Sequence, residues 1–85
     1  GILSDEFLED VRHMKERNLA VELLERLLKD DIRSRFKTNV VQQAKFSELL
    51  QMSLQRYRNR AIETAQVIEE LIEMAKKFQE AASRG

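Results

Sequence analysis

The sequence predicts an all-α fold, a small bundle of three long helices preceded by a short N-terminal helix. Proline is absent and the only glycines are Gly1 and Gly85, so no interior residue breaks a helix or favours a positive φ. Hydrophobic residues make up 42% of the chain and charged residues 35%, a balance typical of amphipathic helices. A length of 85 residues allows one domain, and the absence of cysteine excludes a disulfide scaffold. We therefore expect a single helical domain over residues 1–85.

The short helix is expected from Asp5 to about Lys15. Ser4 is suited to cap it, and acidic residues in its first turn complement the helix dipole. Its apolar positions follow helical spacing at Phe7, Leu8, Val11 and Met14.

The first long helix is expected from Leu19 to about Phe36, with Asn18 as its N-cap. Acid-first pairs at a spacing of four residues are expected on its wet side, and they are Glu25 with Lys29 and Asp31 with Arg35. A broad apolar stripe forms its inner side: Ala20, Leu23, Leu24, Leu27, Leu28 and Ile32.

The next helix is expected from Val40 to Arg58, capped by Thr38 or Asn39. Its predicted apolar side consists of Ala44, Phe46, Leu49, Leu50, Leu54 and Tyr57. The last helix follows Asn59 and runs to about Ala82, although nothing at Asn59 decides between two helices and one bent helix. Its heptad-like seam is predicted at Ala61, Ala65, Ile68, Ile72 and Ala75, widened by Leu71, Phe78 and Ala82.

The charges balance, with 15 basic and 15 acidic residues, so no overall positive field gathers nucleic acid or anionic lipid. The sequence has no apolar run long enough for a membrane span. We expect a cytoplasmic protein with no membrane partner.

The sequence predicts no catalytic, cofactor-binding or metal site. His13 is the only histidine, and with Asp10 it makes half of a helical carboxylate metal site, which is too few ligands. Without an interior glycine the chain has neither a P-loop nor a dinucleotide-binding fingerprint. The acids of the last helix are better explained by an exposed face on which Glu73 pairs with Lys76 or Lys77.

Three arginines near the end of the third predicted helix form a weak candidate for DNA or phosphate contact: Arg56, Arg58 and Arg60. Basic groups beside an aromatic ring, here Tyr57, can hold phosphates and stack a base. The alternative is that these cations lie beside the carbonyls of a helix end.

Three stretches of the chain resemble one family. They are the Lys37-Thr38-Asn39 junction, FSELL at 46–50, and YRNRAIETAQVIEELIEMAKK at 57–77. Together they resemble the C-terminal helical domain of the R subunit, the endonuclease and motor subunit, of type I restriction enzymes. The likeness extends over most of the chain.

This resemblance implies that the fragment is not an enzyme, while its parent would be an ATP-dependent type I site-specific deoxyribonuclease that uses ATP and Mg. It implies a role in docking that subunit on the methyltransferase core of modification and specificity subunits. The partners implied are the upstream domains, that core, and DNA for the whole complex, in a bacterium or archaeon. The candidate contact residues are Phe7, Leu8, Val11, Met74 and Phe78. The alternative is that these residues belong to the core of the domain.

Two other functions remain open. One is an accessory DNA contact through the three arginines. The other is a self-associating coiled coil built on the alanine and isoleucine seam, although a homodimer is not favoured because small alanines serve equally well within one chain.

Overall fold

The structure is a computed structural model that describes the backbone of residues 4–84 and the side chains of residues 4–80. Over that range the chain forms helices and no strand, which confirms the all-α prediction. The helices are α1 (Asp5–Arg12), α2 (Arg17–Arg35), α3 (Val40–Arg58) and α4 (Thr64–Arg84). In the part of the chain described, no helix is both long and apolar enough to cross a membrane.

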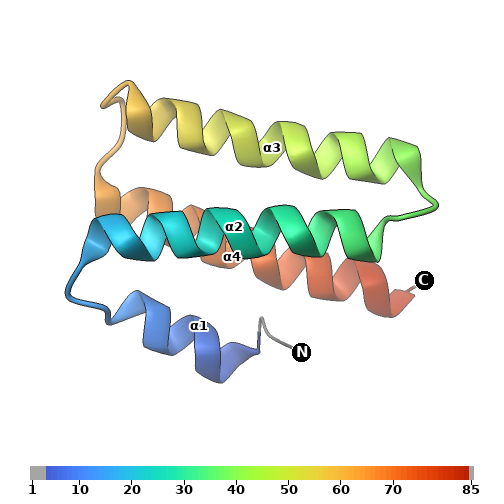
Figure 1. Ribbon diagram of the computed structural model, residues 1–85, viewed down its shortest axis with the longest axis horizontal. Helices are drawn as coiled ribbons and strands as arrows, with labels where there is room; N and C mark the ends of the chain where they lie inside the picture. Colours follow the sequence, from blue (N-terminus) through green and yellow to red (C-terminus); the bar gives the residue numbers. More distant parts are fainter. Residues whose placement is uncertain (1–3, 85) are drawn as a thin grey trace.

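Each helix runs antiparallel to the one before it (Figure 1). Helices α2, α3 and α4 pack against one another, and α4 lies behind α2 in Figure 1. The short α1 lies on the opposite side of the α2–α4 pair from α3 and contacts α4. Helix α4 therefore contacts all three other helices, whereas α1 and α3 lie on opposite flanks.

The core is a single cluster between the helices. On α2 the innermost positions step by four residues, because every fourth side chain returns to the same face of a helix. Among the described side chains, the most completely buried ones on the long helices have no more than 1% of their surface exposed: Ala20, Leu24, Leu28, Leu50, Leu54, Val67, Ile68, Leu71, Ile72, Ala75 and Phe78.

Two of the predicted caps are confirmed. The Ser4 hydroxyl accepts a hydrogen bond from the Phe7 N–H at 3.3 Å, and Asn39 Oδ1 accepts one from the Gln42 N–H at 3.1 Å. Both bonds satisfy N–H groups that have no partner within the first turn of a helix. Helix α3 begins at Val40 and ends at Arg58, as predicted.

The predicted start of α2 is wrong. The helix begins at Arg17, and Glu16 holds the cap position without a side-chain cap. Asn18 lies inside the first turn, where its Oδ1 accepts a hydrogen bond from the Tyr57 hydroxyl at 3.0 Å. This contact with α3 occupies the oxygen that an N-cap would need.

Helix α1 ends at Arg12, three residues before its predicted end. The His13 N–H donates to the carbonyls of Glu9 and Asp10, both at 3.2 Å, and the Met14 N–H donates to Val11 at 3.2 Å. This tightened last turn ends α1 and lets the chain reverse into α2.

Helices α3 and α4 are separate, which answers the question that the sequence left open. Because α4 begins at Thr64, Ala61 lies outside it in the connecting segment and is exposed, as is Ala65 in its first turn. The predicted seam is therefore wrong at its first two positions, whereas Ile68, Ile72 and Ala75 are buried. The buried face of α4 is wider than a coiled-coil seam because it packs against three helices. The side chain of Ala82 lies outside those described.

Three phenylalanine rings pack at the end of the bundle where α2 passes into α3. Phe36 stacks on Phe46 with ring centroids 5.0 Å apart, and Phe78 meets Phe46 edge to face at 4.6 Å. The Phe36 and Phe78 centroids are 6.3 Å apart. One ring follows α2, one lies early in α3 and one late in α4, so the cluster joins the three long helices.

Candidate interaction surfaces

Four of the five predicted partner-contact residues belong to the core. Leu8 and Val11 of α1, and Met74 and Phe78 of α4, are all buried. Phe7 is half-buried against the same cluster. The structure thus places four of these residues inside the core, and Phe7 is the one that is only partly buried.

The exposed large apolar side chains lie elsewhere. Among the described residues, Leu49 of α3 is 40% exposed and Met52 is 54% exposed, while Val40 and Val41 at the start of α3 are 72% and 79% exposed. Leu19 on α2 is the other member of this set. Helix α3 therefore carries most of the exposed apolar surface. The predicted place of Leu49 on the inner side is wrong, because the burial of Leu50 and Leu54 turns Leu49 outward.

Leu49 and Met52 border a groove between α3 and α4, with Phe46 and Met74 also lining it, and its volume is about 440 Å³. Fully burying a leucine or methionine side chain is worth roughly 1.5–3 kcal/mol. Since both residues are already about half buried, covering them would contribute only about 2 kcal/mol in total.

The α4 side of this groove is acidic. Glu69 Oε2 lies 2.8 Å from Arg12 Nε, an ion pair that attaches α1 to α4. Glu70 accepts a hydrogen bond from the Ser53 hydroxyl at 2.9 Å and pairs with Arg56 at 3.4 Å. Glu73 makes no ion pair with any described residue, so the predicted pairing with Lys76 or Lys77 is absent from the part of the chain described.

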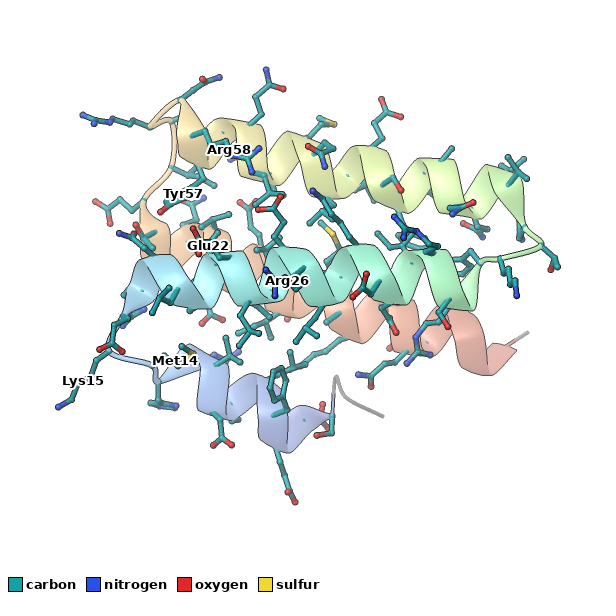
Figure 2. The ribbon with its side chains drawn as sticks, viewed as in Figure 1. Met14, Lys15, Glu22, Arg26, Tyr57 and Arg58 are labelled. Carbon is teal, nitrogen blue, oxygen red and sulfur yellow. The ribbon has the colours of Figure 1, made fainter. Side chains whose placement is uncertain are left out.

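Two of the three arginines proposed for DNA contact are paired within the domain. Arg56 bonds Glu70 of α4, and Arg58 Nη2 lies 3.1 Å from Glu25 of α2. In Figure 2, Arg58 lies between α3 and α2 beside Tyr57. Arg60 has no ion pair with any residue in the described range. These pairs offset the positive charge of the patch, and the DNA contact stays a prediction.

Glu25 is the centre of a small charge cluster on α2. Lys29 Nζ lies 2.9 Å from its carboxylate, as the sequence predicts, and Arg58 approaches from α3. Burial alone raises the pKa of Glu25, but the hydrogen bonds and charges of Lys29 and Arg58 outweigh it and hold the pKa below its ordinary value. The other predicted pair on α2, Asp31 with Arg35, is also present at 2.7 Å.

Arg60 has a backbone φ of 60°, in the left-handed region where glycine is usual. Its N–H donates to the Tyr57 carbonyl at 3.0 Å, and the Ala61 N–H donates to the Arg56 carbonyl at 2.8 Å. This pair of bonds is the Schellman motif that ends many helices. Nothing in the sequence signals this motif, because an arginine holds the position that glycine normally fills.

His13 is exposed at the end of α1, where its Nδ1 lies 2.8 Å from the Glu9 carbonyl oxygen. Among the described residues, no group of three or more His, Cys, Asp or Glu side chains is arranged to hold a metal ion.

The comparisons with known proteins point to one family. The whole chain, residues 1–85, matches the family described as type I restriction enzyme HindI endonuclease subunit-like, C-terminal. It is 39% identical to the putative type I restriction enzyme MjaIXP endonuclease subunit of Methanocaldococcus jannaschii. It is 33% identical to the type I restriction enzyme HindI endonuclease subunit of Haemophilus influenzae. Each match covers 100% of this chain and 8% of the relative, and no solved structure matches the chain significantly. The chain therefore belongs to the family of C-terminal domains of type I restriction enzyme endonuclease subunits.

Proposed function

We propose that this domain is a non-catalytic assembly module that docks its endonuclease subunit on the methyltransferase core of modification and specificity subunits. The observation that carries the proposal is the exposed apolar surface of α3. Val40 and Val41 at its start remain 72% and 79% exposed, although the domain already has a continuous core. Such surface in a family of endonuclease-subunit domains favours burial against a partner.

Three arginines of the domain support the same function, because their ion pairs connect its own helices. Arg12 joins α1 to α4, Arg58 joins α3 to α2, and Arg56 joins α3 to α4. A scaffold that must keep a partner-binding helix in a fixed orientation gains from such pairs. In this proposal, ATP, Mg and the DNA substrate act on upstream domains of the subunit, in the cytoplasm of a bacterium or archaeon.

The start of α3 is the expected docking point. Val40 and Val41 are adjacent, and both are more exposed than the other large apolar side chains of α3. Their β-branched side chains are stiff, so little side-chain entropy is lost when a partner covers them.

The direct test is co-purification of the full endonuclease subunit with its methyltransferase core, with and without this domain. We expect deletion to abolish assembly while the rest of the subunit stays folded. Intact assembly after deletion would refute the docking role.

A finer test keeps the domain in place. Val41→Glu should weaken assembly at least about tenfold, since it places a charge in the buried part of the interface. Leu19→Glu is the matched control, because it alters an exposed apolar residue on α2 instead. Equal loss with both variants would show that the effect does not come from α3.

A further inference from the structure

The groove between α3 and α4 is the second apolar feature of this domain, separate from Val40 and Val41. Its lining includes Phe46, Leu49 and Met52 from α3 and Met74 from α4. The two most exposed of these, Leu49 and Met52, stand on the same side of α3 one turn apart. Methionine side chains adapt to the shape of an occupant, and here they come from both helices.

The length of the groove suits a helix. On α4 its lining runs from Gln66 to Lys77, which at 1.5 Å per residue is about 16 Å, or three helical turns. An amphipathic helix that lies in such a groove places apolar residues at spacings of three and four along one face. The occupant therefore needs two or three apolar anchors within about three turns.

The charge of the groove selects a basic occupant. Its lining holds three carboxylates against two basic groups. Glu69 and Glu70 are already paired with arginines, but Glu73 has no ion pair with any described residue. A lysine or arginine on the occupant would find its partner at Glu73. Nucleic acid is disfavoured, because the groove offers phosphates little free positive charge: of its two cations, Arg56 is already paired with Glu70.

The small apolar area of the groove points to an occupant that is covalently linked to the domain. Covering two half-exposed side chains contributes less than the loss of translational and rotational freedom when separate molecules associate. A segment of the same polypeptide avoids most of that loss through its high effective concentration. The relatives extend far beyond this domain, which matches 8% of their length.

We propose that the α3–α4 groove holds a basic amphipathic helix from another part of the same endonuclease subunit. This contact fixes the orientation of the domain on its own subunit and leaves the start of α3 free for a different partner. The inference does not depend on docking to the methyltransferase core.

Photo-crosslinking of the full endonuclease subunit, purified without other subunits, tests the proposal. Met52→Cys carries a benzophenone label. This domain has no cysteine of its own, so only cysteines elsewhere in the subunit need to be replaced to make the labelling specific. We expect a crosslink within one polypeptide, which mass spectrometry maps to an upstream amphipathic helix that bears lysine or arginine. Adding Glu73→Lys should lower the yield at least about fivefold, because it reverses the charge facing the basic residue.

Gln51→Cys is the matched control, since this residue neighbours Met52 and is exposed but does not line the groove. It should give little of that crosslink. Circular dichroism of each variant checks the fold. A crosslink only to a second copy, a crosslink to a non-basic segment, equal yields from both positions, or no crosslink would overturn the proposal.

Assembly with the methyltransferase core is measured separately on the domain-deleted subunit. If deletion leaves assembly intact while the intramolecular crosslink forms, the docking function fails and the groove assignment stands. If deletion abolishes assembly but no crosslink forms, the groove assignment fails alone.

Discussion

At the end of the bundle where α2 passes into α3, three phenylalanine rings pack on one another, whereas at the opposite end α3 is joined to α2 and α4 by polar contacts. Tyr57 bonds Asn18 and Arg58 bonds Glu25 across α3 and α2. Figure 2 shows Tyr57 and Arg58 together at this polar end, far along α3 from its first turn.

The difference separates two requirements of a small helical bundle. Burial of rings stabilises the fold strongly but is non-directional, so it does not by itself fix how far one helix slides along another. Hydrogen bonds and partly exposed ion pairs contribute less free energy but require a defined geometry. We infer that the aromatic end supplies stability and that the polar end sets the position of α3 relative to α2.

The largest expected effect comes from the aromatic end. Phe78→Ala removes a fully buried ring and should lower the free energy of unfolding by about 3–5 kcal/mol. Urea unfolding followed by circular dichroism measures the loss. Phe7→Ala, at a half-buried position on α1, should cost clearly less. Similar losses for both variants would contradict the larger contribution to stability that we assign to the aromatic cluster.

At the polar end, the backbone of Arg60 should respond next most strongly. Arg60→Gly relieves the left-handed strain but adds freedom to the unfolded chain, for a net stabilisation of roughly 0.5–1 kcal/mol. Thermal unfolding should show a higher Tm. Asn59→Gly is the control, because Asn59 has a φ of −85° and no such strain. A gain at position 59 with none at position 60 would refute the explanation.

A smaller loss is expected from the hydroxyl of Tyr57. Tyr57→Phe removes its hydrogen bond to Asn18 and should cost about 0.5 kcal/mol, at the low end for a hydrogen bond because the pair is exposed. A double-mutant cycle with Asn18→Ala isolates the coupling between the two side chains. Zero coupling would mean that this bond does not help to place α3.

The smallest effect depends on pH. Because the pKa of Glu25 is lowered in the folded state, its contribution to stability is fully present above the pKa of the unfolded chain and disappears as pH falls through the folded pKa. Glu25→Gln should therefore lose a few tenths of a kcal/mol relative to the unchanged protein at pH 7, and clearly less near pH 3.

The urea midpoint at both pH values measures this difference. Glu22→Gln, which changes an exposed α2 acid without an ion pair to any described residue, should show no comparable difference. A Glu25→Gln effect that persisted unchanged at low pH would show that packing, not charge, is responsible.

Local signals made much of this fold predictable. Asn39 marks the start of α3 because its side chain caps that helix directly, and the i,i+4 pairs of α2 need no knowledge of other helices. The prediction of Asn18 as an N-cap was wrong because its side-chain oxygen accepts a hydrogen bond from Tyr57, 39 residues away. The start of α4 was missed because Arg60, just past the end of α3, has a positive φ for which the sequence carries no signal.

The candidate surfaces were less predictable for a physical reason. Helical periodicity places Leu8, Met74 and Phe78 on apolar faces, but it does not say how many neighbouring helices cover each face. Only the packing of α4 against three helices decides that these residues are core and that Leu49 and Met52 are not. The family resemblance, by contrast, needed no geometry and agrees with the family match over the whole chain.

The central place of α4 also bears on how the domain forms during protein synthesis. The helix that contacts all the others is the last of the four to be synthesised. The faces of α1, α2 and α3 that pack on it therefore stay uncovered until then. Folding of the domain must then follow completion of α4, with the order of synthesis setting the earliest moment at which the core can close. Loss of the last helix from a shortened gene product would leave three helices without their shared neighbour, whereas loss of α1 would still leave the three long helices packed on one another.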